Sequence, residues 1–129
     1  EAKLKSSKKI TVWGTGSALR EFLFVDDLAN ASCFLMNLSK DKYQKEISEM
    51  SSHINVGSGE ELSIKDLAEL LLIITDFKGK IEWDKSRPDG TPRKLLNHNK
   101  LKKLGWTHNV SIKSGLEITY KDYVENFNK

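Results

Sequence analysis

The chain has 129 residues, of which 38% are hydrophobic and 30% are charged, and its formal net charge is +3 at pH 7. This length and composition are typical of one globular domain with a modest core. Such a small positive surplus does not indicate nucleic-acid binding. No apolar run reaches the roughly 18 residues of a membrane span, and no secretory signal pattern opens the chain. We therefore expect neither nucleic acid nor a membrane as a partner.

Cysteine and histidine usage points away from disulfide and metal chemistry. Cys33 is the single cysteine, so the chain forms no internal disulfide. Its apolar neighbours Phe34 and Leu35 predict a buried thiol, and the reducing cytoplasm is the expected setting. The histidines stand far apart, without cysteine or glutamate at metal-ligand spacing. We expect no metal site.

The chain begins with a lysine- and serine-rich stretch, residues 1–9, that predicts a disordered or frayed start before a folded portion over residues 10–129. Residues 10–13 predict a short strand. A glycine-containing turn follows at residues 14–17, and residues 20–25 predict a second strand. Two short strands joined by such a turn indicate a hairpin.

A helix is predicted over residues 28–36, after a pair of carboxylates. Asp26 or Asp27 would cap its free amides and complement its dipole. Residues 39–52 are polar and charged, which predicts a surface connection with some helix. Residues 53–56 predict a short apolar strand.

A second helix is predicted after Ser63, where apolar residues recur at helical spacing. Asp66 lies three residues after Ser63, which is an acidic variant of the capping box. Gly79 stands where that helix would end. Residues 80–83 then predict another strand.

The remaining elements are a short helix over residues 98–104, capped by Asn97 and closed by Gly105, and a last helix that starts at Ser111. Short strands that alternate with helices indicate an α/β organisation.

One loop suggests a binding role. The sequence Pro88-Asp89-Gly90-Thr91-Pro92 directly precedes Arg93 and Lys94. Its prolines fix φ and its glycine lets the chain turn back, so the loop could hold an anion against the two cations with little further ordering. Ordinary surface charge is the alternative for Arg93 and Lys94. Asp89 would either cap the turn through its own backbone or accept hydrogen bonds from a sugar hydroxyl.

A second segment suggests the same ligand. Trp13 and Arg20 flank a glycine turn, and an aromatic face with a guanidinium suits a ring plus a phosphate. On a strand, however, Trp13 is more often a core residue. Arg20 needs a partner, which is Glu21, Asp26 or a ligand phosphate. The turn itself lacks the third glycine of a dinucleotide fingerprint.

Together these segments resemble the GDP-L-fucose synthases, which belong to the extended short-chain dehydrogenase/reductases of the NAD-dependent epimerase/dehydratase superfamily. The resemblance covers nearly all of residues 10–127. The motifs that carry it, in the order and spacing of that family, are Trp13-Gly14, Arg20-Glu21-Phe22, Val25-Asp26-Asp27, Ser52-His53-Ile54-Asn55-Val56-Gly57, Pro88-Asp89-Gly90-Thr91-Pro92-Arg93-Lys94-Leu95-Leu96 and Leu104-Gly105-Trp106.

The resemblance implies a role in binding a GDP-sugar. Trp13 and Arg20 match positions that contact the nucleotide sugar. Arg20 and Lys94 would neutralise its pyrophosphate, Asp89 would bind a hydroxyl, and Arg93 would help to hold the loop or the phosphates. The implied reaction converts GDP-4-keto-6-deoxy-D-mannose to GDP-L-fucose by 3,5-epimerisation and reduction with NADPH.

The resemblance is confined to the C-terminal substrate-binding portion of that enzyme, with the Rossmann N-terminal half absent. NADP would be bound by that N-terminal half, and we expect no cofactor in this chain. No tyrosine here is followed four residues later by lysine, so a catalytic Tyr-x-x-x-Lys pair is lacking. We therefore expect no catalytic residue and no activity from this chain alone. A standalone nucleotide-sugar-binding or interaction module is the alternative.

The chain also departs from the family pattern at Ser17-Ala18, Phe24 and Asn97, where proline, histidine and aspartate are common. None of these is a predicted contact. Apolar faces in residues 26–56 would pack on the dinucleotide-binding half, so we expect self-association, local rearrangement or disorder here. A monomeric, fully ordered chain in X-ray scattering and hydrogen exchange would contradict this.

Overall fold

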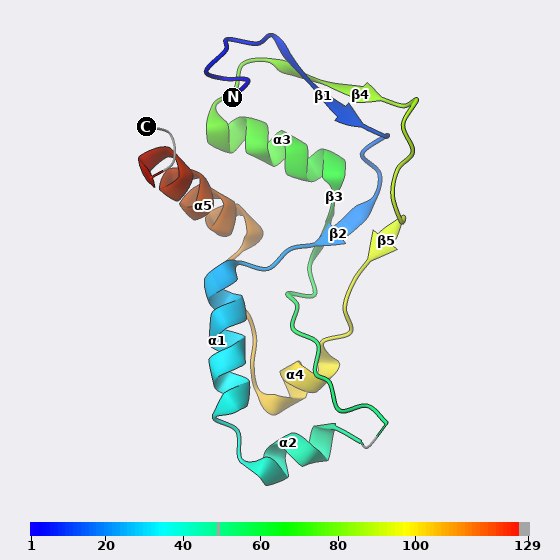
Figure 1. Cartoon of the computed structure of the whole chain (residues 1–129), viewed down its shortest axis with the longest axis vertical. Coiled ribbons are helices and arrows are strands. Elements are labelled where there is room, and N and C mark those ends of the chain that lie inside the picture. The colour runs from blue at the N-terminus through cyan, green and yellow to red at the C-terminus, as the bar shows by residue number, and fades with distance from the viewer. Residues whose placement is uncertain (49, 127–129) are drawn as a thin grey trace. The chain divides into compact units, whose positions relative to one another are not determined.

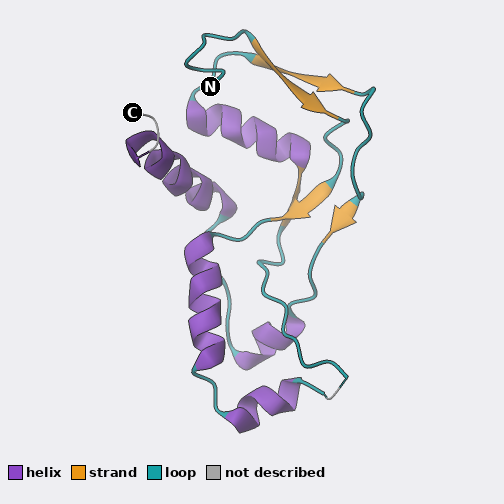
Figure 2. Cartoon of the chain, in the orientation of Figure 1, coloured by secondary structure: helices purple, strands orange, loops and turns teal. Residues whose placement is uncertain are grey.

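The structure, a computed structural model, describes residues 1–48 and 50–126. Short strands and helices are interspersed along the chain, as Figures 1 and 2 show. The chain divides into two compact units, and each unit is assembled from separate stretches of sequence. Unit 1 comprises Glu1–Arg20, Glu61–Lys94 and Leu116–Lys129, and unit 2 comprises Glu21–Glu60 and Leu95–Gly115. The predicted α/β organisation is confirmed.

Unit 1 contains a two-stranded parallel sheet. Strand β1, Lys9–Trp13, pairs with β4, Lys80–Asp84, in a register that sets Trp13 opposite Asp84. Side chains in β1 alternate between exposed and half-buried, as expected for a strand with one covered face. Both strands were predicted. The structure gives residues 2–6 a turn and begins β1 at Lys9. The frayed start over residues 1–9 stays a prediction.

The predicted hairpin is wrong. Strand β2, Leu19–Glu21, does not pair with β1; it pairs in parallel with β5, Arg93–Lys94, and lies between β5 and β3, Glu61–Ser63. The strand also ends at residue 21 rather than 25. Both neighbouring strands are only two or three residues long, so they offer a longer β2 no backbone partners.

Helix α3, Ile64–Thr75, begins as predicted. The Ser63 hydroxyl accepts a hydrogen bond from the Asp66 amide, and the Asp66 carboxylate accepts one from the Ser63 amide, which completes the capping box. The predicted end at Gly79 is wrong, because Asp76 closes the helix in the left-handed conformation (φ 51°). Aspartate is among the residues that tolerate this conformation, so no glycine is needed there.

Two further helices run close to their predicted bounds. Helix α4 spans Asn99–Leu104, with His98 at its N-cap and Gly105, at φ 101°, closing it as predicted. The Asn97 side chain accepts a hydrogen bond from the Asn99 amide, one residue before the position of a cap. Helix α5, Ile112–Asn126, follows Ser111 as predicted.

In unit 2, helix α1 spans Val25–Met36 and α2 spans Lys40–Glu46, within the predicted surface connection. The predicted cap of α1 is wrong. Phe24 is the N-cap residue and makes no side-chain cap, while Asp26 and Asp27 lie inside the first turn. Two negative charges there still complement the positive end of the helix dipole.

Asp27 instead joins two segments of unit 2. Its side chain is 3% exposed, and its two carboxylate oxygens accept hydrogen bonds from the backbone amides of Asn109 and Val110 at 3.1 and 2.9 Å. A buried carboxylate is costly unless such donors satisfy it. Asp27 therefore fixes the stretch that leads into α5 against the start of α1.

The apolar core of unit 2 is small. Ala31, Leu101 and Trp106 are buried at 0%, 1% and 6% exposure, and the Trp106 indole donates a hydrogen bond to the Asn30 side chain at 2.8 Å. Five partly buried residues complete the cluster: Leu23, Phe34, Leu35, Ile54 and Val56.

The predicted strand over residues 53–56 is wrong. This segment is irregular, although Ile54 and Val56 pack on the core as a strand face would. The Asn55 side chain donates to the Asn97 carbonyl at 3.1 Å, so a side chain supplies the link to the segment before α4.

The predicted burial of Cys33 is also wrong. Cys33 is exposed, whereas Ala31, two positions earlier on α1, is fully buried. Two positions along a helix amount to roughly 200°, so these residues lie on opposite faces.

Within the described residues, no helix combines the length and apolar character that crossing a bilayer requires.

Replacing Asp27 with alanine should destabilise unit 2 by leaving two amides without their acceptor. We expect the free energy of unfolding to fall by about 2 kcal/mol more than in Asp26→Ala, measured by urea denaturation. Asp26 is the matched control because it is exposed and lies in the same helical turn. Equal losses in the two variants would mean that helix-dipole effects, and not the bonds to Asn109 and Val110, account for the role of Asp27.

Candidate functional site

Arg20 and Lys94, which come from distant parts of the sequence, are neighbours in unit 1. They are directly paired in the parallel register of β2 and β5, one position after the pair formed by Leu19 and Arg93. Side chains at paired positions leave a sheet on the same face. Arg20 is half-buried and Lys94 is exposed. Two cations side by side on one face form an electrostatic site suited to an anion.

The Arg20 side chain lies against the proline-bounded loop. Its Nη1 donates to the Leu19 carbonyl at 2.6 Å, and a Cβ placed on Gly90 would lie 3.3 Å from its Nη2. The Leu19 amide also donates to the Pro92 carbonyl at 2.8 Å, which fixes the end of the loop to β2. The sequence predicts Glu21, Asp26 or a ligand phosphate as the partner of Arg20. Within residues 1–48 and 50–126, neither Glu21 nor Asp26 forms an ion pair with it.

Asp89 ties the loop to the turn after β1. Its carboxylate oxygens accept hydrogen bonds from the Thr15 amide at 2.8 Å and from the Thr15 hydroxyl at 2.6 Å. These bonds lower the pKa of Asp89 below its ordinary value. The carboxylate thus caps a neighbouring turn rather than its own, and its contact with a sugar hydroxyl stays a prediction.

Gly14 makes this close approach feasible. It has φ 85°, where glycine is favoured, and a Cβ at this position would collide with the Asp89 carboxylate. Glycine is therefore required here both by the backbone conformation and by the space that Asp89 occupies.

Trp13 is a surface residue. It is 70% exposed at the end of β1, so the alternative that it belongs to the core is wrong. The guanidinium of Arg87 lies over the ring, 5.2 Å from its centroid, in a cation–π contact. The cation placed over this ring is Arg87, and not Arg20 or Lys94. An exposed indole face in unit 1 is suited to stacking on a flat ligand group.

Arg93 has a protein partner. Its Nε and Nη2 donate to the Glu61 carboxylate in three hydrogen bonds of 2.8, 3.0 and 2.6 Å. The hydrogen bonds from Arg93 lower the pKa of Glu61, and the Glu61 carboxylate raises the pKa of Arg93. Both groups are therefore ionised at neutral pH. Sequence reasoning left open whether Arg93 holds the loop or the phosphates, and it missed Glu61, which no motif marks.

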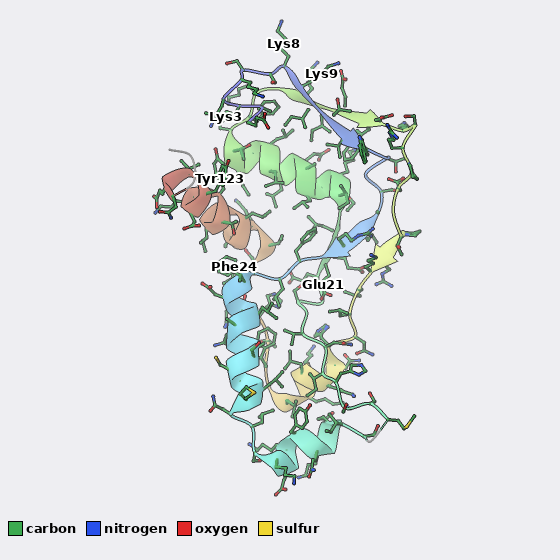
Figure 3. All side chains as sticks on the ribbon, in the orientation of Figure 1. Lys3, Lys8, Lys9, Glu21, Phe24 and Tyr123 are labelled. Carbon is green, nitrogen blue, oxygen red and sulfur yellow. The ribbon has the colours of Figure 1, made fainter. Side chains whose placement is uncertain are left out.

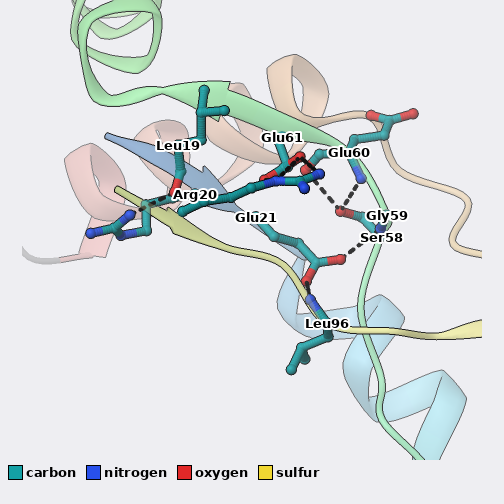
Figure 4. A network of polar contacts seen from close by, with 9 residues as sticks. Leu19, Arg20, Glu21, Ser58, Gly59, Glu60, Glu61 and Leu96 are labelled. Carbon is teal, nitrogen blue, oxygen red and sulfur yellow. Dashed lines mark hydrogen bonds and ion pairs between the residues drawn. The ribbon is translucent and has the colours of Figure 1, made fainter. Parts of the chain in front are cut away.

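Glu21 links two loop segments of unit 2. The Glu21 side chain is labelled in Figure 3. Its carboxylate accepts hydrogen bonds from the Gly59 amide at 2.6 Å and from the Leu96 amide at 3.1 Å (Figure 4). A Cβ on Gly57 would collide with the same carboxylate. The glutamate in the Arg20-Glu21 motif thus accepts hydrogen bonds from backbone amides of unit 2, whereas Arg20 belongs to unit 1.

The glycine turns at residues 14–17 and 57–59 do not open a helix. Such a site needs a glycine-rich turn that opens a helix, because the helix N-terminus binds the pyrophosphate. The turn at residues 14–17 leads into strand β2, and the Gly57-Ser58-Gly59 turn leads into strand β3. The described part of the chain contains no group of three or more potential metal ligands.

An apolar cavity in unit 1 lies apart from the predicted residues. It has a volume of about 370 Å³ and contains none of Trp13, Arg20, Asp89 and Lys94. Its lining comes from the N-terminal segment, β1, the end of α3 and α5, and includes Leu4, Ile10, Phe77, Tyr120 and Val124. The binding prediction therefore depends on the Arg20–Lys94 face and the loop beside it.

Comparison with known proteins agrees with the motifs. A model of the NAD dependent epimerase/dehydratase family matches residues 2–57. Putative GDP-L-fucose synthase 2 of Arabidopsis thaliana is 52% identical over 126 residues, which cover 98% of this chain and 36% of that protein. GDP-L-fucose synthase of Escherichia coli (strain K12) is 43% identical, over 98% of this chain and 39% of its own length.

Solved structures agree as well. MlghC, a GDP-mannoheptose C4 reductase from Campylobacter jejuni solved with NADP bound, superposes with a TM-score of 0.76 and is 35% identical. The match covers 90% of this chain and 35% of that protein. The chain thus spans little more than a third of the length of these relatives, in their C-terminal part. By sequence and fold, the chain is similar to the GDP-L-fucose synthases over a C-terminal segment of their length.

Proposed function

We propose that this chain is the substrate-binding portion of a GDP-L-fucose synthase and that it grips a GDP-sugar through Arg20 and Lys94. The observation that carries the proposal is the direct register pairing of these two cations on β2 and β5. A pyrophosphate bridges two adjacent cations well, because charge-assisted hydrogen bonds to its oxygens are among the stronger polar contacts in proteins.

The other two predicted residues have complementary roles in this proposal. The exposed ring of Trp13 offers a flat surface to the nucleotide sugar. Asp89 retains acceptor capacity beyond its bonds to Thr15, because an ionised carboxylate has more lone pairs than that residue uses, and it accepts a hydrogen bond from a ligand hydroxyl.

In the whole enzyme the substrate is GDP-4-keto-6-deoxy-D-mannose. Carbons beside a ketone are acidic enough for proton exchange, so 3,5-epimerisation and reduction of the ketone can share one pocket. NADPH supplies the hydride when it is bound, and MlghC, the relative solved with NADP, supports this cofactor for the family. In our proposal the cofactor and the catalytic groups lie in the dinucleotide-binding half, outside these 129 residues, and this chain holds the nucleotide sugar.

The cytoplasm remains the proposed setting. Self-association through unit 2 also remains a proposal, and the exposed apolar side chains of α1 support it. Val25, Leu28 and Met36 are 66%, 47% and 85% exposed, which is unusual for large apolar residues on one short helix.

GDP should bind to the purified chain and depend on both cations. We expect calorimetry to show that Arg20→Ala and Lys94→Ala each weaken GDP binding by about 10-fold or more, since a charge-assisted hydrogen bond contributes roughly 1.5–3 kcal/mol. Lys102→Ala, which removes an exposed lysine from α4, serves as the control and should bind GDP normally. Equal effects in all three variants would leave only a nonspecific attraction between GDP and a basic protein.

The chain alone should not oxidise NADPH in the presence of the keto sugar. The reason is that none of its tyrosines precedes a lysine at the catalytic spacing and its glycine turns at residues 14–17 and 57–59 do not open a helix. The measurement is the decrease in NADPH absorbance against a blank without protein. Turnover above that blank would show that the chain carries its own catalytic groups.

The Thr15 amide should report the ionisation of Asp89. Because hydrogen bonds from Thr15 lower the pKa of Asp89, the bond between the loop and the turn stabilises the fold fully above the ordinary Asp pKa of about 3.9 and is lost as pH falls through the lowered folded-state value. NMR should show the Thr15 amide shift titrating below that ordinary pKa. The titration should vanish in Asp89→Asn and persist in Asp41→Asn, an exposed site on α2. A midpoint at or above the ordinary value would contradict the assigned bonds.

A further inference from the structure

The bridge between Glu61 and Arg93 joins the two outer strands of a three-stranded sheet. Glu61 is the first residue of β3 and Arg93 the first of β5, and β2 lies between these strands. Neighbouring strands are about 4.8 Å apart, so the outer two are separated by about twice that distance. The long Arg93 side chain spans this gap, and its planar guanidinium donates three hydrogen bonds to the Glu61 carboxylate.

The bridge and the proposed anion site occupy opposite faces of the sheet. Arg93 is paired in register with Leu19, and Lys94 with Arg20. Successive side chains along a strand point to opposite faces, so Arg93 shares a face with Leu19 while Lys94 shares the other with Arg20. The bridge therefore crosses β2 on the Leu19 side and leaves the Arg20–Lys94 side open.

Strand β5 has few contacts of its own, although Asp89 ties the loop before it to Thr15 and Glu21 binds the Leu96 amide after it. It has only two residues, and both have exposed side chains. The Leu19 amide donates to the Pro92 carbonyl just before the strand, and this backbone bond lies next to the bridge. A strand this short is marginal without further contacts. Within the strand itself, the contact that fixes Arg93 also helps to hold Lys94 beside Arg20.

We propose that Glu61 and Arg93 are positioning residues, which hold β5 against β2 so that Lys94 lies beside Arg20 for binding the pyrophosphate. This inference rests on the proposed function. It assigns a role to Glu61, and it places Arg93 among the supports of the loop instead of among the phosphate ligands.

The charge distribution favours this role. Two of the guanidinium nitrogens of Arg93 are engaged with Glu61, whose side chain is 15% exposed, and the carboxylate neutralises the cation locally. A phosphate that approached Arg93 would also approach the negative charge of Glu61, which disfavours binding there. Lys94 has no carboxylate partner among the ion pairs of the described residues, so its charge remains available to a ligand.

The test compares GDP binding with backbone protection in single and exchanged variants. Glu61→Gln and Arg93→Gln should each weaken GDP binding by about 3- to 10-fold in calorimetry. The exchanged pair, Glu61→Arg with Arg93→Glu, should recover most of that loss, because the bridge can form in the opposite sense. Glu69→Gln is the control, since it removes an exposed carboxylate from α3 in the same unit.

Hydrogen exchange at the Leu19 amide gives a second readout that needs no ligand. Its protection should fall in both single variants and return in the exchanged pair. The Lys80 amide, which lies in β4 and donates to the Lys8 carbonyl just before β1, should keep its protection throughout and so exclude general unfolding.

Two results would overturn the proposal. If Arg93→Gln weakens GDP binding while Glu61→Gln leaves it unchanged or strengthens it, Arg93 is itself a phosphate ligand. If Leu19 protection is unchanged in both single variants, the bridge does not hold β5. Failure of the unaltered chain to bind GDP would count against the proposed function alone, because Leu19 protection still decides what the bridge does.

Discussion

Parallel pairing of β2 with β5 is the interaction on which the candidate site depends. It joins the segment after the first glycine turn to the segment after the proline-bounded loop, and its register sets Arg20 beside Lys94. Each strand is too short to be stable alone. The pairing is supported from outside the ladder by the bond between Asp89 and Thr15 and by the bridge between Glu61 and Arg93. Side-chain hydrogen bonds therefore stabilise this pairing, as additional backbone hydrogen bonds would in a longer sheet.

Unit 2 relies on the same kind of support. Its buried apolar cluster is small, and polar side chains connect its segments. Asp27 binds the backbone before α5, Asn55 binds the Asn97 carbonyl, and Glu21 binds the amides of Gly59 and Leu96. Each of these side chains satisfies backbone groups that no strand or helix satisfies. Long irregular segments can be held in defined positions in this way, at the cost of dependence on a few carboxylates and amides.

Local signals in the sequence predicted the elements that depend on neighbouring residues. The capping box at Ser63 and Asp66, the glycine that closes α4 and the start of α5 after Ser111 were all found where expected, because their hydrogen bonds reach only a few positions along the chain. Pairing partners were not predictable in this way. The glycine turn after Trp13 suits a hairpin by residue type, yet β1 found its partner in β4, far along the sequence. Residues 53–56 have the composition of a strand, but no strand pairs with them in the described part of the chain.

The sequence by itself determined the α/β class and the similarity to the GDP-L-fucose synthases, and it predicted the four candidate ligand contacts, because these follow from motifs in a fixed order. Tertiary structure alone decided how those residues are used. In the folded chain, the exposed ring of Trp13 contacts the Arg87 guanidinium, and Asp89 accepts hydrogen bonds from Thr15. Arg93 pairs with Glu61, and Arg20 lies beside Lys94. The physical reason is range: a cap or a turn is encoded by adjacent residues, whereas strand register and long-range carboxylate bonds depend on segments that meet only when the chain folds.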